Sequence, residues 1–491
     1  MPVRFCTIIS ALVAALAITA CESSTGPTGD TISVCHVTGS AGTIISIHTS
    51  LLAGYKRQGD YVANLVVSKK SVASNDSIHF ARIGDALTVA RAGRLARGET
   101  QTAACRITIA VDTGVFQGTT DGTAGGSIDK WPLVIDVPDI SLIGSFTMQV
   151  DAQGRATGTG EGGRSTILSP AVPLPFDEFS QPLIIVNGHP NGSAGDGATI
   201  AGFVLQSGHA GVDDEPSGQG VFALRVHALT VGGNRIEGPF TESLDLRASS
   251  GLVDRNFLNG VGGSCDICLA GPGDYQATNN RLIAGGIPGI LIIATTLIPV
   301  DSLVEQYDLP SSASVTAIVT NNEVRNHLRQ PVGVGLRVGA IGVGAPDVAG
   351  TAHVVAHDNL FDNNTFGVLV EAAFPVSGTL LRGDIDLTLG GNIVSHSCQH
   401  DLLVAFSRHT TVLGLTNLPY LHDSHYSLTL GGDLQWADAW YGHPEGYGNA
   451  LVVDGVTIPN GARSAYDANK ICNPSNPLRD RASESRASLS R

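Results

Sequence analysis

Charged side chains are scarce in this sequence, and basic ones are the scarcest. Only 15% of the 491 residues are charged, and 29 lysines and arginines stand against 44 aspartates and glutamates, which gives a formal net charge of −15. The basic residues form no patch along the chain. Because nucleic acids are bound by clustered Lys and Arg, this balance argues against a nucleic-acid partner.

A long apolar segment is also lacking. The run Thr7–Ala20 follows Arg4 and is too short to cross a bilayer comfortably. It ends in the letters ITAC, which resembles the lipobox of bacterial lipoproteins, and the resemblance implies cleavage before a diacylated Cys21. We therefore expect a lipoprotein signal peptide over 1–20 and a flexible polar tether over 21–30.

This resemblance implies a place in the cell envelope, as an outer membrane lipoprotein or at the cell surface, with the lipid as the membrane anchor. An ordinary secretory signal that happens to contain a cysteine is the alternative. Either leader exports the chain to an oxidising compartment.

Cysteines are few, and none has the spacing of a zinc finger. Without Cys6 in the signal peptide and Cys21 for the lipid, six of the eight remain, and these permit three disulfides with fifteen connectivities. No second Cys-x-x-Cys exists, and a disulfide is the simpler interpretation of the cysteine between His396 and His400, so we predict no metal site. The predicted disulfides are Cys35–Cys105, Cys265–Cys268 and Cys398–Cys472.

Glycine, in contrast, is abundant, with 60 residues, and a phrase built around asparagine recurs between 228 and 404. An apolar residue stands three positions before each asparagine and another stands two positions after it. The residue just before it is mostly Gly, Asn or Asp, which tolerate the positive φ of a tight corner. The six asparagines are Asn234, Asn256, Asn280, Asn322, Asn359 and Asn392. The apolar residues after them are Ile236, Leu258, Leu282, Val324, Phe361 and Val394.

The spacing of the phrase predicts a solenoid. The first two distances between asparagines are 22 and 24 residues, and a second strand-like segment follows each asparagine. Such coils must stack to bury their apolar edges. Leucine-rich repeats share the period, but their leucine pattern and helical arm are missing. The pattern predicts an all-β, right-handed parallel β-helix with an asparagine ladder inside one corner.

The segment before the repeat resembles the entrance of pectate-lyase-like β-helix proteins. Asp85–Arg97 has helical periodicity, a strand-like run begins at Ile107, and Trp131–Gly144 and Ala198–Gly208 are similar to the first coils of that superfamily. The resemblance implies a right-handed single-stranded parallel β-helix over 83–472, with a helix capping its open end.

The two ends of the chain fall outside this solenoid. Cys35, His36 and Gly59–Tyr61 resemble a short cysteine–histidine module of secreted bacterial proteins, so a small module is expected over 31–82. Residues 473–491 are rich in Ser, Arg and Asp without an apolar period, and we expect them to be disordered.

Later spacings between the asparagines are longer, and the surplus falls after the second strand each time. Insertions that leave one edge of consecutive coils would form a wall along one side, and such insertions commonly mark a binding face. The four insertions lie at 294–314, 339–352, 371–383 and 407–424.

Outward positions beside the ladder form a charged stripe, which is most simply a solvated face. Within it Glu323, Arg325 and Asp362 are candidate catalytic residues, because their coils carry long insertions. The superfamily resemblance implies that Arg325 would be a base or substrate clamp and Asp362 an acid or a calcium ligand. Calcium is therefore expected only if the protein is a lyase, and otherwise no cofactor.

Aromatic residues are only 5% of the chain, so a cluster near its end stands out. Trp436, Trp440 and Tyr441 would stack on sugar rings if they were exposed. A hydrophobic cap over the final coil is the simpler interpretation.

Two functions stay open. One is a non-catalytic protein, monomeric, that binds carbohydrate or another envelope component. The other is a lyase or glycoside hydrolase acting on an acidic polysaccharide, although the GHG and RIK companions of polygalacturonases and the arginine-proline motif of pectate lyases are missing.

Overall fold

Short strands separated by tight turns make up most of the computed structural model. It describes residues 31–38, 41–69, 78–99, 103–119, 128–171, 182–187, 194–208, 218–260, 264–285, 288–295, 313–328, 333–343, 350–371, 381–405, 423–437, 439–441 and 449–458. The helices in these ranges are α1 (Leu52–Arg57), α2 (Ile83–Ala96) and the 3-10 turns η1 (Thr49–Leu51) and η2 (Glu161–Gly163). None of these helices has both the length and the apolar character needed to span a membrane.

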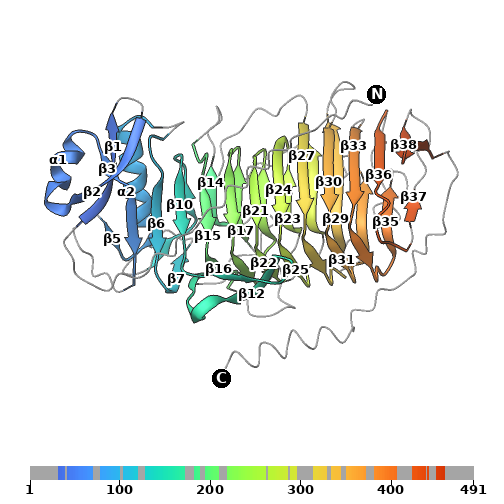
Figure 1. Cartoon of the computed structure of the whole chain (residues 1–491), viewed down its shortest axis with the longest axis horizontal. Helices are drawn as coiled ribbons and strands as arrows, with labels where there is room; N and C mark the ends of the chain where they lie inside the picture. The colour runs from blue at the N-terminus through green and yellow to red at the C-terminus, as the bar shows by residue number, and fades with distance from the viewer. Residues whose placement is uncertain are drawn as a thin grey trace, which may run out of the picture.

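Three stacks of strands run along the molecule (Figure 1). Sheet I contains β4 (Asn64–Val67), β6 (Ile107–Val111), β10 (Ile140–Ile143), β15 (Thr199–Ala201), β18 (Leu229–Gly232), β21 (Gly251–Asp254), β24 (Gly273–Thr278), β27 (Ala313–Thr320), β30 (Gly350–His357), β33 (Leu381–Gly390), β36 (His425–Leu430) and β38 (Ala450–Val453). Sheet II contains β7 (Gly114–Thr119), β13 (Thr166–Pro170), β16 (Phe203–Gln206), β19 (Arg235–Glu237), β22 (Phe257–Asn259), β25 (Arg281–Ile283), β28 (Glu323–Arg325), β31 (Leu360–Asp362) and β34 (Ile393–Ser395). Sheet III contains β9 (Leu133–Ile135), β14 (Pro182–Asn187), β17 (Gln219–Leu224), β20 (Glu242–Arg247), β23 (Cys265–Ala270), β26 (Pro288–Thr295), β29 (Val334–Val343), β32 (Phe366–Glu371), β35 (His400–Ala405) and β37 (Ala439–Tyr441).

Consecutive strands of each sheet pair in parallel. This holds along sheet I, sheet II and sheet III. From β15 to β35 the chain visits sheets I, II and III in that order on every turn. The chain is a right-handed parallel β-helix, as the sequence predicts.

The predicted apolar positions form the core. The residue two positions after each ladder asparagine is no more than 5% exposed, and Phe361 is fully buried. These side chains stack turn upon turn inside the solenoid, because each coil presents its apolar edge to the next.

The predicted asparagine ladder lies in the corner between sheets I and II, where the six side chains are at most 1% exposed. The side-chain amides of the first five donate to Oδ1 of the next asparagine over 2.8–3.1 Å. The same Oδ1 accepts the backbone N–H of the preceding asparagine over 2.9–3.1 Å. Each amide also donates to a carbonyl of the previous turn, at 2.8–3.0 Å. The ladder thus satisfies backbone groups that water cannot reach.

The residue before each ladder asparagine has φ between +52° and +63°, as the corner prediction requires. Five of the six are Gly, Asn or Asp, and the exception is Arg255 at φ +52°. A long side chain in this conformation is strained, so the coil geometry overrides the residue's own preference there.

Helix α2 closes the N-terminal end of the solenoid, as predicted (Figure 1). It buries Ile83, Ala86, Leu87 and Ala90 in the core and contacts β9 and β4. An apolar helix face over the first turn shields the otherwise open end of the stack from water.

The N-terminal segment joins the solenoid directly. Strands β1 (Thr31–Thr38), β2 (Ala41–His48) and β3 (Tyr61–Val62) form an antiparallel sheet, and β5 (His79–Phe80) pairs with β4. Although 31–82 was predicted as a separate module, β4 is hydrogen bonded in register to β6 of sheet I. The predicted disulfide Cys35–Cys105 connects this segment to the solenoid, with Cα atoms 6.0 Å apart.

All four insertions connect the end of a sheet III strand to the next strand of sheet I. They leave β26, β29, β32 and β35 and return at β27, β30, β33 and β36. The insertions therefore start at one edge, as predicted, although most of their residues lie outside the described ranges.

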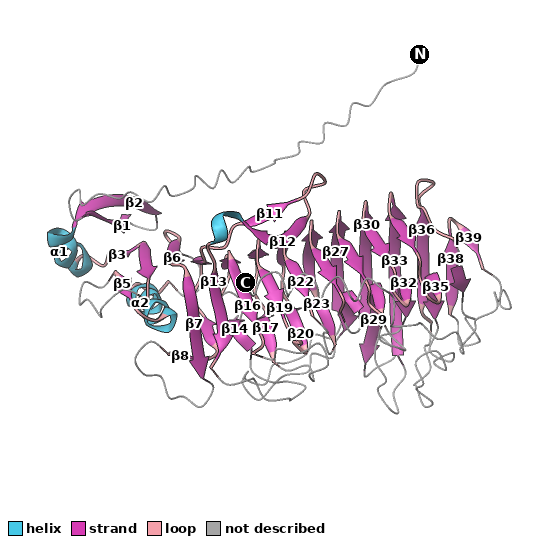
Figure 2. Cartoon of the chain, turned by 90° about the horizontal axis from the view of Figure 1, so that it is seen from below, coloured by secondary structure: helices cyan, strands magenta, loops and turns pink. Residues whose placement is uncertain are grey.

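A hairpin between β10 and β13 was not predicted. It contains β11 (Met148–Val150) and β12 (Ala156–Gly160), which pair antiparallel, and β12 packs against β22 and β25 of sheet II. Figure 2 shows the hairpin beside the solenoid strands. Short strands β8 (Asp129–Lys130) and β39 (Val456–Thr457) complete the structure.

We predict that Asn322→Ala lowers the free energy of unfolding by at least about 3 kcal/mol, because it strands several buried donors and acceptors at once. Asn322 accepts from the backbone and side chain of Asn280, and it donates to Asn359 and to the carbonyl of Ala277. Chemical denaturation monitored by circular dichroism measures the change. The control is Asn259→Ala, an asparagine on the outer side of β22, and equal losses for both variants would contradict the ladder's role.

Candidate functional site

The outer side of sheet II carries the predicted charged stripe. Strand pairing places Glu323 next to Arg281, and Asp362 next to Arg325. Residues from the hairpin and from the turn after β34 join them. We call this group the ion-pair face: Asp151, Arg155, Arg281, Glu323, Arg325, Asp362 and His396.

Glu323 is the centre of the ion-pair face. Its Oε2 lies 2.7 Å and 2.9 Å from Nη2 and Nε of Arg281, and its Oε1 lies 2.7 Å from Nε of Arg325. Arg155 approaches to 4.0 Å. The side chain is only 7% exposed, so this predicted catalytic carboxylate is held by arginines on several sides.

The hairpin closes over the N-terminal half of the face. Arg281 also binds Asp151 of the hairpin at 2.6 Å, and its side chain is only 19% exposed. Arg155 donates to Oδ1 of Asn321 at 3.0 Å and to the carbonyl of Asp358 at 3.3 Å. Over these turns the charged stripe therefore consists of ion pairs that the hairpin partly covers, and it is not a freely solvated face.

The C-terminal half of the face is more open. Asp362 lies 3.8 Å from Arg325, whose side chain is 38% exposed. Its Oδ1 accepts a hydrogen bond from Ser395 at 2.8 Å and lies 2.7 Å from Nδ1 of His396. His396 is 80% exposed and has φ +53°. The structure thus brings Glu323, Arg325 and Asp362 together and adds an exposed histidine.

Sequence reasoning missed the contact of His396 with Asp362, because it grouped this residue with Cys398 and His400. A signal was present: His396 lies four positions after the ladder asparagine Asn392, one turn beyond Asp362. Cys398 is disulfide-bonded, and its predicted partner Cys472 lies outside the described residues.

The predicted aromatic residues lie at the end of the solenoid. Gln435 pairs with Ile393, so Trp436 follows sheet II, and its side chain is 37% exposed. Tyr441 packs against the core, and burial raises its pKa. Trp440 pairs with Leu403 on sheet III through its backbone. Strand pairing therefore places Trp436 and Tyr441 on different sheets.

The outer side of sheet III carries a second polar group. The outward residues Asp245, Leu369 and Leu403 of this sheet are fully buried. Asp245 binds Arg247 through Nε at 2.8 Å and 3.0 Å, and Glu242 lies beside them. Burial, and then the charge of Asp245, raise the pKa of Glu242 to about 8.

The predicted disulfide Cys265–Cys268 lies one turn further on, with its Cα atoms 5.8 Å apart. Its neighbour Asp266 points to the interior, where Oδ2 lies 2.9 Å from Nε2 of the fully buried His327. Burial raises the pKa of Asp266, and the contact with His327 opposes this shift. Both side chains are buried, with Asp266 3% exposed.

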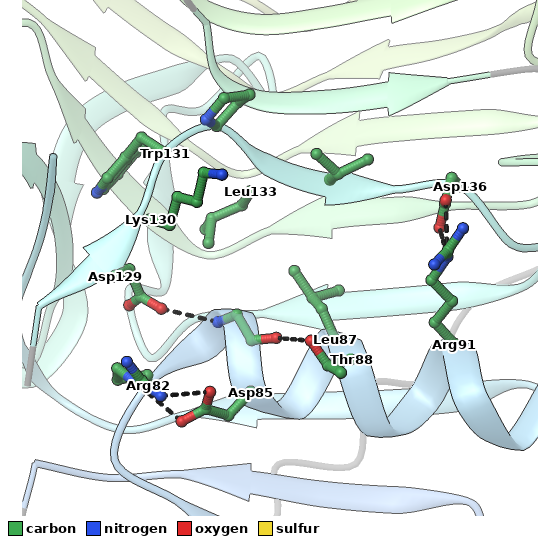
Figure 3. Close-up of a pocket in the computed structure, with 13 residues that line it drawn as sticks. Arg82, Asp85, Leu87, Thr88, Arg91, Asp129, Lys130, Trp131, Leu133 and Asp136 are labelled. Carbon is green, nitrogen blue, oxygen red and sulfur yellow. Dashed lines mark hydrogen bonds and ion pairs between the residues drawn. The ribbon is translucent and has the colours of Figure 1, made fainter. Parts of the chain in front are cut away.

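A depression of about 690 Å³ lies at the N-terminal end, between α2 and the turn before β9 (Figure 3). Two ion pairs line it: Arg82 binds Asp85 at 2.7 Å, and Arg91 binds Asp136 at 2.8 Å. Asp129 accepts the backbone N–H of Gly84 at 2.8 Å and so caps α2. These contacts attach the capping helix to the first turns. Each of the three acids that line the depression, Asp85, Asp129 and Asp136, has a partner.

The residues of the ion-pair face offer little to a calcium ion. Calcium requires six to eight oxygen ligands, whereas Glu323 is held by arginines and Asp362 faces Arg325 and His396. Within the described residues, the one group whose ligand atoms lie close enough to hold a metal ion is Glu242, Cys265 and Cys268.

No protein-family model matches this sequence. No curated protein matches it either. The fold is therefore established by the strand pairing.

Several solved structures are similar in arrangement. An exopolygalacturonase from Thermotoga maritima has 10% identity and a TM-score of 0.40, over 79% of this chain and 92% of that chain. A DFA-IIIase from Arthrobacter chlorophenolicus A6 has 12% identity and a TM-score of 0.40, over 81% and 97%. The mannuronan C-5 epimerase A-module from Azotobacter vinelandii has 12% identity and a TM-score of 0.34, over 74% and 91%. At these identities and scores the likenesses carry no argument about activity.

The buried carboxyl group of Glu371 on sheet III should make the stability of the protein depend on pH. Glu371 lies 2.5 Å from Arg337 and is 4% exposed. Burial raises its pKa and Arg337 only partly opposes the shift. The folded state therefore keeps a proton that the unfolded chain has already released, so stability is lost as pH rises above the ordinary glutamate pKa of about 4.3.

We predict that, as pH rises above about 4.3, the free energy of unfolding of wild type falls relative to that of Glu371→Gln. The relative loss should reach up to about 1.4 kcal/mol per pH unit. Urea denaturation from pH 4 upward (about the ordinary glutamate pKa) measures it. Glu237→Gln, on the outer side of sheet II, is the control for removing a carboxylate. A difference that stays constant or grows with pH would contradict the prediction.

Proposed function

We propose that this chain is an exported monomeric protein that binds a glycan on the outer side of sheet II, near its C-terminal end. The observation that supports this proposal is His396, whose side chain is 80% exposed while Asp362 holds its Nδ1 at 2.7 Å. His396 stands at a corner with φ +53°, the conformation that Ala284, Asn326 and Asn363 have at the same corner of earlier turns, so the solenoid fixes its backbone.

The surroundings of His396 combine polar and apolar groups. Arg325 lies 3.8 Å from Asp362, and Leu360 and Ile393 form the neighbouring outward column of the same strands. Ile393 is 40% exposed. We call Arg325, Leu360, Asp362, Ile393 and His396 the C-terminal subsite.

This mixture suits a sugar. A sugar ring presents hydroxyl groups that donate and accept, together with a face of C–H groups. His396 and Asp362 supply donors and acceptors, Arg325 matches a carboxylate if the glycan is acidic, and Ile393 gives the C–H face an apolar contact. Trp436, which follows the residue paired with Ile393, extends this surface to the end of the solenoid with a ring that is 37% exposed.

Binding without chemistry is favoured because the carboxylates are already engaged. Glu323 is 7% exposed and contacts Arg281 and Arg325, so it is not available to accept or donate a substrate proton. Separate acid and base groups with different environments are what glycoside hydrolysis requires.

One observation favours a second candidate function, a lyase or hydrolase. Asp362 orients His396 through Nδ1, which leaves Nε2 on the solvent side of an 80% exposed ring. A histidine oriented by a carboxylate is a competent general base. In this alternative His396 would be the base and Arg325 the clamp for a substrate carboxylate.

The binding proposal predicts that wild-type protein binds at least one member of a glycan panel, and that His396→Ala and Ile393→Asp each weaken binding by about tenfold or more. Titration calorimetry with polygalacturonate, alginate and an inulin-type fructan measures this. Arg235→Ala is the matched control, because Arg235 lies on the same side of the same sheet and pairs with Glu237. It should bind as wild type does.

Binding that is equal in all variants would place the ligand elsewhere and overturn the subsite. Incubation of the same glycans with the protein separates the two candidates. Unsaturated products or new reducing ends that disappear in His396→Ala would replace the binding function with the enzymatic one.

We also propose that the protein is anchored to the cell envelope through a lipid on Cys21, which lies outside the described residues. Support comes from the apolar run that ends in the ITAC box. Cys21→Ser should move the protein from the membrane fraction to the soluble fraction, because it removes the thiol that would carry the acyl chains. Fractionation and immunoblotting measure this, and unchanged membrane association would contradict the anchor.

A further inference from the structure

Two cysteines and one glutamate lie against one another on the outer side of sheet III. Cys265 pairs in register with Glu242 of the preceding turn, and Cys268 pairs with Asp245. The two sulfurs and a carboxylate oxygen of Glu242 all lie within 4.8 Å of one another. The exposed fractions of Cys265, Cys268 and Glu242 are 1%, 3% and 8%. Two thiolates and a carboxylate are ligands that zinc accepts in a tetrahedral site.

The neighbours of Glu242 have the arrangement of an outer shell around a metal site. The side-chain amide of Gln219 donates to Oε2 of Glu242, and also to Oδ2 of Asp245 at 3.0 Å. Arg247 is bound by Asp245 at 2.8 Å but approaches Glu242 only to 3.4 Å. Glu242 is therefore oriented by an amide. Of the two adjacent carboxylates, it lies farther from the positive charge of Arg247. Partners that orient a ligand in this way raise metal affinity.

The fold itself does not require these residues. The equivalent outward positions of the next turn along sheet III are Pro288 and Leu291, and Arg337, Leu369 and Leu403 occupy the position of Cys268 on later turns. All of these neighbours build the same sheet. Other residues at the equivalent positions thus form the same sheet, and the solenoid does not need Glu242, Cys265 and Cys268 in order to form.

We propose that Cys265, Cys268 and Glu242 bind a zinc ion when both sulfurs are thiols, so that this part of sheet III has two exclusive forms, a disulfide and a metal complex. The fourth position falls to a solvent molecule or to Asp245, which pairs in register with Cys268. Zinc is the divalent ion that suits two sulfur ligands and one oxygen ligand without redox chemistry of its own.

The two forms interconvert by thiol–disulfide exchange. A dithiol reductant gives two electrons and two protons to the Cys265–Cys268 disulfide and becomes a disulfide itself. Zinc then binds the two sulfurs as thiolates and displaces their two protons. Oxidation reverses the sequence: the sulfurs lose two electrons to an acceptor disulfide, the S–S bond forms, and the ion is released.

The test compares the protein in its two redox forms. Protein made in a reducing cytoplasm and kept in a phosphine reductant should contain about one zinc per chain, the stoichiometry of one closed site. The air-oxidised protein should contain at least tenfold less. Inductively coupled plasma mass spectrometry measures zinc, and replacement by Co²⁺ should give the charge-transfer absorption of thiolate ligands.

Cys268→Ser and Glu242→Gln should each lower zinc affinity by about 10–100-fold or more, since loss of even an outer partner has an effect of that size. Cys398→Ser is the matched control and should keep the zinc. Glu242→Gln preserves size and hydrogen bonding, and circular dichroism establishes that each variant is folded. A reduced wild type without zinc, or a folded Glu242→Gln variant with undiminished affinity, would overturn the proposed site.

Discussion

The hydrogen bonding of the corner between sheets I and II is the constraint on which the rest of this structure depends. The corner is buried, so its backbone groups cannot bind water, and it is a turn, so they have no regular strand partner. An asparagine side chain offers a donor and an acceptor at the right reach, and each of the six uses both toward neighbouring turns. A ladder of this kind continues only if the next turn also provides an asparagine. The ladder therefore keeps the strands of every turn in the same register, even where a turn carries a long insertion between sheets III and I.

A fixed register has consequences for the surface. Strands of sheet II are only three residues long beyond β16, so every outward side chain lies next to the ladder and meets the same neighbour on the adjacent turn at the strand spacing of about 4.8 Å. Like charges so placed would destabilise the stack, and opposite charges support it. Arg281 beside Glu323 and Arg325 beside Asp362 follow this rule. The same rigidity suits a binding site, because a ligand meets side chains whose positions are already set by the scaffold.

The fold was predictable because its determinants are local and repeated. The ladder asparagines, the apolar residue two positions later and the turn-favouring residue before them recur within each coil, and the structure places Phe361 and its equivalents in the core as expected. The hairpin of β11 and β12 gave no such signal. It occurs once, and Arg155 finds its partner Asn321 across 166 residues of sequence. His396 escaped notice for a related reason: its contact with Asp362 depends on a corner with φ +53° that turns the ring back toward the preceding coil. A one-dimensional pattern shows which residues point outward, but the partners of those residues depend on which turns lie side by side.

The contrast between the outer sides of sheets II and III bears on function. On sheet II the hairpin covers Glu323 and Arg281, whereas Arg325 and His396 at the C-terminal half of the ion-pair face are 38% and 80% exposed, so the charges of that half remain in contact with water and cost little to maintain. On sheet III Glu242, Asp245 and Arg247 are each at most 8% exposed, and buried ion pairs often contribute less to stability than apolar residues of the same volume. Leu369 and Leu403 show that this sheet accepts apolar residues at the same outward column. Buried charge nevertheless recurs in this column, because Arg337 stands between Leu291 and Leu369 and pairs with Glu371. The outward column of sheet III therefore accepts either apolar residues or compensated charges, and the choice between them is made turn by turn.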